Sequence, residues 1–156
     1  MTTNSAPQQS VATAQRLNDA IIRLRARLRT ESGQHATGLT PTQLGVLASV
    51  VREGPVTAAR LAALERVSAQ SIAQSLAVLK AAGLVHSAPD ERDGRKKLMS
   101  ADPSATELID KLLTGRASFL ARAIDQLVAR DERADVEKAI ELLERFATAE
   151  LNEGGI

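Results

Sequence analysis

The spacing of apolar residues predicts that most of the chain is helical. In the stretch 11–29 apolar side chains recur at steps of three and four, at Ala14, Leu17, Ile21, Leu24 and Leu28. Such spacing places them in one narrow stripe on a helix, and arginines fill much of the remaining surface. The stripe is close to a heptad seam, which suits packing against another helix. Two alternatives are open: an ordinary surface helix on its own core, or a helix that packs across a dimer.

The stretch 39–52 carries one of the clearest helix starts in the sequence. Thr40 stands where it can cap a helix, Pro41 fits the first helical position, and Gln43 is placed to complete a capping box. The pattern predicts that this helix runs to about Arg52 and ends at the Gly-Pro pair at 54–55.

Two short helices follow, and about three residues separate them. Thr57 can cap a helix over 58–65, and Ser68 can cap another helix that ends at Gly83. Two short helices with so brief a connection predict a helix-turn-helix.

The helix after Ser68 has one apolar side and one side of small polar residues. Ile72, Leu76 and Leu79 recur at steps of four and three on the apolar side. The polar side carries Gln70, Ser71, Gln74, Ser75 and Lys80. Hydrogen-bonding side chains without large apolar groups suit the base edges and phosphates of a DNA major groove. The alternative is a solvated polar face without a partner.

A basic hairpin is predicted directly after this helix. The stretches 84–87 and 97–100 are short enough to be paired strands, and residues 88–96 connect them. Basic residues crowd this region, at Arg92, Arg95, Lys96 and Lys97. Asp93 is placed to orient the guanidinium of Arg95, and an arginine at a hairpin tip suits a narrow DNA minor groove. The alternative is a solvated surface hairpin.

Two further amphipathic helices are predicted in the C-terminal third. Asp102 and Pro103 open a long helix with a wide apolar stripe, and a last helix carries apolar residues from Val136 to Leu151. With the first helix they make three terminal helices without a domain of their own to cover. We therefore expect a homodimer, and a two-fold dimer repeats its recognition helix ~34 Å away along DNA. The residues expected in the dimer interface are Leu17, Ile21, Leu24, Leu120, Ile124, Ile140 and Leu143.

Composition excludes several classes of function. The chain has 156 residues and no cysteine, which rules out disulfides, thiolate metal sites and cysteine redox switches. His35 and His86 stand apart without a His/Glu cluster, so we expect neither a metal nor another cofactor. Because no nucleophile stands beside a base and no glycine-rich phosphate loop occurs, we do not expect an enzyme. The polar start has no signal peptide or membrane span, which predicts a cytoplasmic protein.

The formal net charge of +1 hides an uneven distribution of charge. Residues 1–51 carry five arginines against two acids, or +3, and residues 52–97 carry eight basic residues against five acids, again +3. Residues 98–156 carry seven basic residues against twelve acids, or −5. The surplus of basic residues therefore lies in the part of the chain that is expected to contact double-stranded DNA. The acidic third leaves an alternative open, a dimeric protein-interaction module on the same fold without ligand control.

Two short motifs follow one another after the polar-faced helix, AGLV at 82–85 and DERDGR at 90–95. In these motifs, and in the order of six helices and a β-wing, the chain resembles the MarR family of bacterial transcriptional regulators over roughly 17–151. The resemblance implies a mainly α fold with a small β-wing, in which a winged helix-turn-helix domain is joined to terminal helices that form a dimerisation region. It also implies a homodimeric regulator, expected to be a repressor, that binds a pseudo-palindromic operator and is released by a small aromatic or phenolic ligand.

The resemblance also implies roles for individual residues. Those that read the groove would be Ser68, Gln70, Ser71, Gln74 and Ser75. Arg95 would enter the minor groove with Asp93 as its organiser, and the phosphate contacts would come from Arg92, Lys96 and Lys97. Thr57 would contact a phosphate through its amide and hydroxyl.

Five segments are expected along the chain. They are a disordered tip over 1–10, a dimerisation helix and loop over 11–38, a winged helix-turn-helix over 39–101, dimerisation helices over 102–151 and a flexible tail over 152–156.

Overall fold

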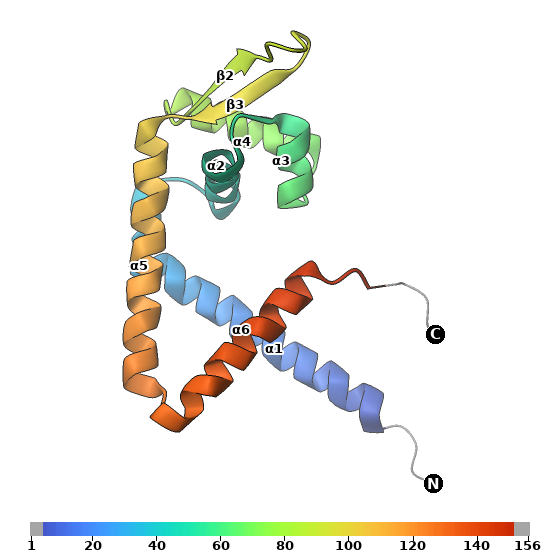
Figure 1. Cartoon of the computed structure of the whole chain (residues 1–156), viewed down its shortest axis with the longest axis vertical. Coiled ribbons are helices and arrows are strands. Elements are labelled where there is room, and N and C mark those ends of the chain that lie inside the picture. The colour runs from blue at the N-terminus through green and yellow to red at the C-terminus, as the bar shows by residue number, and fades with distance from the viewer. Residues whose placement is uncertain (1–4, 152–156) are drawn as a thin grey trace. The chain divides into compact units, whose positions relative to one another are not determined.

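The computed structural model describes residues 5–151, except for the side chains of residues 5–7, and is mostly helical. Figure 1 labels its helices and strands. The chain groups into two compact units, 1–117 and 118–156, whose boundary falls inside one long helix. The expected mainly α fold with a small β-wing is confirmed. Within the described range, no helix is both long and apolar enough to cross a membrane.

Helix α1 spans Ser5–Glu31 and starts earlier than the apolar pattern predicts. Residues 5–10, expected in a disordered tip, form its first turns, whereas residues 1–4 and the expected tail 152–156 lie outside the described residues. Polarity alone was misleading, because Ala, Gln and Ser continue a helix at little cost and proline is tolerated in the first turn. A short 3-10 helix, η1 (Gln34–Thr37), follows between two glycines in the left-handed conformation.

Three helices, α2 (Pro41–Glu53), α3 (Ala58–Glu65) and α4 (Ala69–Ala81), form the predicted helix-turn-helix region. The capping box of α2 is complete. The Gln43 amide donates to Thr40 Oγ1 over 3.2 Å, and the Thr40 amide donates to Gln43 Oε1 over 3.0 Å. These bonds satisfy two backbone groups that a helix start otherwise leaves unpaired, so α2 begins at one defined residue.

A three-stranded antiparallel sheet packs with these helices, and its strands lie in the order β1-β3-β2. Strands β2 (Val85–Pro89) and β3 (Lys97–Ala101) form the predicted hairpin, in which Val85 pairs with Ala101. The third strand, β1 (Val56–Thr57), adds to the other edge of β3. The sequence did not predict β1, because two residues are too few to show an alternating pattern.

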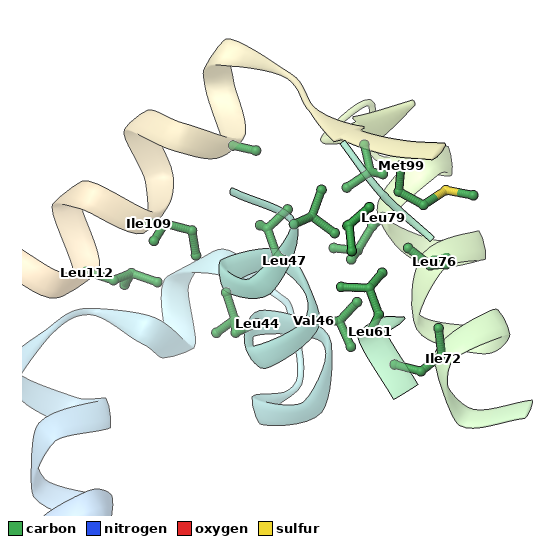
Figure 2. Close-up of a cluster of buried hydrophobic side chains, with 14 residues drawn as sticks. Leu44, Val46, Leu47, Leu61, Ile72, Leu76, Leu79, Met99, Ile109 and Leu112 are labelled. Atoms are coloured by element: carbon green, nitrogen blue, oxygen red, sulfur yellow. The ribbon is translucent and has the colours of Figure 1, made fainter. Parts of the chain in front are cut away.

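The hydrophobic core lies where α2, α3, α4 and β3 meet the first turns of α5 (Pro103–Leu127), as Figure 2 shows. Leu47, Leu61, Ile72 and Leu79 are fully enclosed there. Burying an aliphatic side chain of this size stabilises a fold by roughly 1.5–3 kcal/mol. The core therefore fixes α4 against the hairpin.

The long helix α5 begins where the sequence predicts, and the last helix, α6, ends earlier than predicted. Asp102 caps α5 by accepting bonds from the hydroxyl and amide of Ser104, at 2.5 and 2.9 Å, and these bonds hold the pKa of that carboxyl below its ordinary value. After η2 (Arg130–Glu132), helix α6 spans Arg133–Thr148. The prediction that Leu151 belongs to this helix is wrong, because the backbone turns extended at Ala149 and Leu151 packs against no core that would hold another turn.

Candidate nucleic-acid interface

The outer face of α4 carries small and polar side chains, as predicted, but not all of the residues that the sequence pattern placed there. Gln70 and Gln74 are exposed and stand one turn apart. Ala73 and Ala77 are exposed beside them and complete a strip of four residues along the helix. We refer to Gln70, Ala73, Gln74 and Ala77 as the α4 strip.

The serines predicted to accompany these glutamines lie elsewhere. Ser75 is only 5% exposed and shares the inner side of α4 with Leu76 and Leu79. Ser71 is half-buried, and its backbone amide donates to Ser68 Oγ over 3.1 Å. Simple polarity placed all of them on one face, whereas the 3.6-residue period carries Ser75 to the core side.

Both ends of α4 are fixed by local bonds. Ser68 is exposed and caps the start through the bond from Ser71. At the other end Gly83 has φ of 72°, its amide donates to Lys80 O, and the amide of Leu84 donates to Leu79 O, both over 3.0 Å. This pair of bonds is the glycine-terminated helix end that the AGL motif predicts. It also sets where β2 starts.

The turn between α3 and α4 is made by a residue in an unusual conformation. Arg66 has φ of 53° and ψ of 44°, the one positive φ outside glycine among the described residues. Its amide donates to the carbonyls of the preceding helix, at Ala62 and Ala63. Arg66 thereby ends α3, and the cap of α4, Ser68, follows two residues later.

A small polar cluster fixes α3 against α2. The hydroxyl of Ser49, a residue that is 1% exposed, donates to Glu65 Oε1, and Arg52 Nη2 donates to the same hydroxyl over 3.2 Å. The Glu65 carboxylate also lies over Gly45, where an added Cβ would stand 2.8 Å from Glu65 Oε2. These contacts hold the two helices at close range next to the turn that leads to α4.

The wing is the hairpin of β2 and β3 with its turn at 90–96. Two aspartates order this turn: Asp90 Oδ1 accepts from the Arg92 amide over 2.9 Å, and Asp93 Oδ1 accepts from the Arg95 amide over 3.2 Å. The Lys96 amide also donates to Asp93 O over 2.9 Å. Asp93 therefore contacts the backbone of Arg95 and sets the turn, whereas the sequence suggested a contact with the guanidinium.

The wing presents four exposed basic side chains, those of Arg92, Arg95, Lys96 and Lys97. Nearby, Thr57 is half-buried and caps α3, accepting from the Arg60 amide over 3.2 Å. Its hydroxyl hydrogen can still donate to an anion at the helix start. The wing, Thr57 and the α4 strip all belong to the same compact unit, and Figure 1 shows the hairpin next to α4.

The residues predicted for a dimer interface lie in both units, and many are exposed. On α1, Ile21 and Leu24 are exposed and Leu17 is half-buried. Leu120 and Ile124 on α5 are half-buried. Ile140 and Leu143 on α6 are each 43% exposed, and no residue of α6 is buried.

A cavity of about 210 Å³ lies within the first unit, and no pattern along the chain indicated it. Its wall comes from α1, η1, α2 and α5, and its polar lining includes Arg25, Arg29, Gln34 and Arg116. Gln34 is 4% exposed and its Oε1 accepts from Arg116 Nη2 over 2.8 Å. The Nε of Arg116 is buried and has no hydrogen-bond partner within the described residues.

No group of three or more His, Asp or Glu side chains that could hold a metal ion occurs between residues 5 and 151.

The sequence analysis missed Ala73 and Ala77, which flank the two glutamines on the surface of α4. Ala73 follows Gln70 by three residues and Ala77 follows Gln74 by three, and this spacing was the signal that could have found them.

Comparisons with known proteins agree with this architecture. A family model described as the MarR family matches residues 37–96. An HTH-type transcriptional regulator of Mycobacterium tuberculosis is 33% identical over 127 residues, which cover 81% of this chain and 87% of the relative. A regulator of the same type from Mycobacterium leprae is 32% identical over the same shares.

Solved structures show the same fold. A Pseudomonas aeruginosa transcriptional regulator protein is 29% identical, has a TM-score of 0.76 and covers 91% of this chain and 98% of its own. A MarR family protein from Bacillus stearothermophilus has a TM-score of 0.73 over the same shares at 19% identity, which shows the fold alone. The family and the relatives are transcriptional regulators and not enzymes. The chain therefore belongs to the MarR family and is a DNA-binding transcriptional regulator of the helix-turn-helix type.

Proposed function

We propose that the protein is a repressor that binds a pseudo-palindromic operator as a homodimer and is released from it by a small organic ligand. The observation that carries this proposal is the presence, in one compact unit, of the α4 strip and of four exposed basic side chains on the wing. We infer repression because a dimer on two successive half-sites would block polymerase where those half-sites overlap a promoter. Such a regulator acts on the chromosome, which in a bacterium lies in the cytoplasm.

In this proposal α4 enters the major groove. Gln70 and Gln74 contact base edges, because their amides both donate and accept hydrogen bonds. Ser68 and Ser71, at the start of α4, contact bases or the nearby phosphates. Ser75 is left out of this surface because only 5% of it is exposed.

The wing binds beside α4. Arg95 enters the minor groove, and the turn held by Asp93 presents it there. The phosphate contacts come from Arg92, Lys96, Lys97 and Thr57. Because each phosphate contact releases counterions, this binding should weaken steeply as salt rises.

A second copy of the chain is the proposed partner for the exposed apolar side chains of α1, α5 and α6. Ile140, Leu142, Leu143 and Phe146 are each at least 43% exposed on α6. Monomeric proteins rarely leave such a cluster of large apolar residues in water. A closed two-fold dimer would cover it and present two copies of α4 to the two half-sites.

The cavity within the first unit is the proposed ligand site. Its polar lining includes three arginines, and its apolar lining is aliphatic, with Leu28, Leu44 and Ile109 among the residues. A guanidinium binds a carboxylate through paired hydrogen bonds and can also donate to the single oxygen of a phenolate, and the buried Nε of Arg116 is free to donate one such bond. We therefore infer a small organic anion with an apolar body.

The DNA part of the proposal is tested with single substitutions. Arg95→Ala and Gln74→Ala should each weaken binding to the DNA upstream of the protein's own gene by roughly 1–3 kcal/mol, the range for single base contacts. Lys138→Ala removes the same charge as Arg95→Ala from an exposed site on α6 and should bind like the unaltered protein. Fluorescence anisotropy over a series of salt concentrations measures the DNA affinity of the three variants and of the unaltered protein.

Two outcomes would contradict the assignment. If Arg95→Ala and Gln74→Ala both bind DNA as the unaltered protein does, the site residues are wrong. If no DNA is retained while a protein partner is recovered by pull-down, the chain is an interaction module on this fold.

The ligand part is tested with benzoate, a small aromatic carboxylate. Benzoate should release the protein from DNA, whereas benzamide, its neutral counterpart of similar size, should not, because only the carboxylate pairs with Arg116. Arg116→Met keeps most of the aliphatic stem and should abolish the response to benzoate without changing binding in its absence. Equal release by benzamide, or an unchanged response of Arg116→Met, would count against this site.

A further inference from the structure

The exposed face of α4 has an unusual composition for a helix that enters a major groove. From Ala69 to Leu79 the helix contains no Arg, Lys, Asp or Glu, and its first charged residue is Lys80 in the last turn. The α4 strip consists of two glutamines and two alanines. Val78 adds a further apolar side chain, 41% exposed, one turn after Gln74.

Each base pair offers a different set of groups in the major groove, and this composition matches only some of them. Guanine is read chiefly by Arg or Lys at O6 and N7, and cytosine by Asp or Glu at N4. None of these four residue types is present on α4 before Lys80. Glutamine, in contrast, pairs with N6 and N7 of adenine, and alanine contacts the C5 methyl group of thymine.

The spacing of the strip suits both contacts at once. Gln70 and Gln74 are four residues apart. Ala73 follows Gln70 by three residues and Ala77 follows Gln74 by three, so glutamine and alanine alternate along the helix surface. An alanine methyl is short enough to let the helix backbone come close to the base edges. An adenine bound by glutamine and a thymine methyl packed on alanine can therefore lie on adjacent base pairs.

We propose that α4 reads A·T base pairs, with Gln70 and Gln74 on adenine and Ala73 and Ala77 on the methyl groups of thymine. This inference rests on the proposed function, in which α4 enters the major groove. It adds that the part of each half-site under α4 consists of A·T pairs, and that thymine is recognised through its methyl group.

Selection from a library of random DNA duplexes tests the base composition. The full-length protein is incubated with the library, and the bound duplexes are amplified and sequenced. The expected result is a two-fold symmetric site whose strongest half-site positions are A·T pairs. A site with G·C pairs at the positions protected by α4 would overturn the inference and leave the proposed function standing. Recovery of no enriched duplex would overturn both.

Uracil tests the methyl contact directly, since it pairs like thymine but lacks the C5 methyl group. Each thymine of the selected duplex is replaced in turn by deoxyuridine. Loss of one buried methyl contact should weaken binding about fourfold at the thymines that Ala73 and Ala77 touch. Unchanged affinity for every uracil duplex would contradict the proposal.

Variants connect each methyl group to its alanine. Ala77→Ser keeps the side chain small but places a hydroxyl against the methyl, so it should remove the effect of uracil at one thymine and leave the others unchanged. Ala73→Ser should do the same at a neighbouring thymine. Ala63→Ser, at an exposed alanine of α3, is the matched control and should keep the whole uracil pattern. Uracil effects that persist unchanged in both α4 variants would overturn the assignment.

Discussion

Arg66 shows how a single residue can decide a turn. It holds the left-handed conformation, with φ of 53°, between α3 and α4. That conformation crowds the Cβ of any residue except glycine and costs roughly 1–2 kcal/mol. The bonds from its amide to the end of α3, and the caps on either side, must outweigh this cost.

Arg66→Gly should therefore stabilise the protein. We expect the free energy of unfolding to rise by about 0.5–1 kcal/mol, because glycine adopts a positive φ without the Cβ clash but loses more backbone entropy on folding. Urea denaturation followed by circular dichroism measures the change. Arg66→Ala is the control: it removes the same side chain and keeps the clash, so equal stability of the Gly and Ala variants would refute the explanation.

The arrangement of α2, α3 and α4 depends on contacts between elements and not on helix propensity alone. Ser49 on α2 is almost fully buried and donates to Glu65 on α3, while Arg52 donates to Ser49. Gly45 leaves room for the Glu65 carboxylate, which a Cβ would meet at 2.8 Å. These side chains come from two helices, and each is placed only when the other helix is present.

Ser49→Ala should destabilise the fold by about 1–3 kcal/mol, because it leaves the carboxylate of Glu65 without its buried donor. Ser87→Ala, at an exposed serine of β2, should change stability by less than about 0.5 kcal/mol. In the double variant with Glu65→Ala, part of the loss should be recovered, since no carboxylate is then left unpaired. Thermal unfolding of the unaltered protein, the single variants Ser49→Ala, Glu65→Ala and Ser87→Ala, and the double variant provides the comparison. Losses from Ser49→Ala and Glu65→Ala that simply add in the double variant would argue against a direct bond.

On the scale of the whole molecule, the exposed apolar residues are the main sign of a partner. No residue of α6 is buried in the single chain, although the helix has a clear apolar side with Ile140, Leu143 and Phe146. The proposed homodimer would cover this side. It would also place two copies of α4 about one turn of DNA apart, ~34 Å.

Leu143→Glu should break the dimer and leave each chain folded, because a residue that is 43% exposed contributes little to the core of its own chain. Sedimentation equilibrium should then show a monomer, and DNA binding should weaken because only one half-site is held at a time. Glu141→Gln, on the polar side of α6, is expected to remain dimeric. A dimer that survives Leu143→Glu would place the interface elsewhere.

Local patterns along the chain predict the α-helices, the wing hairpin and most of their boundaries, but not the short strand β1. The caps at Thr40, Thr57 and Ser68 and the glycine at 83 are local signals, since each depends on residues within one or two turns. The mainly α fold with its β-wing could therefore be predicted, and so could the place of the wing turn, but not the bond from the Arg95 amide to Asp93. Two helix ends were predicted wrongly: residues 5–10 are helical and Leu151 is not. The polarity of a residue says little about whether the last turn of a helix includes it.

Which side chains stay on the surface, and which meet across helices, depends instead on packing in the folded chain. That packing leaves Ala73 and Ala77 outside although they are apolar, because a residue as small as alanine fits either environment and its burial depends on its packing partners. It also formed the cavity, where Gln34 and Arg116 come together from positions 82 residues apart. Contacts between distant residues leave no pattern along one chain, so the cavity became visible only in the folded protein.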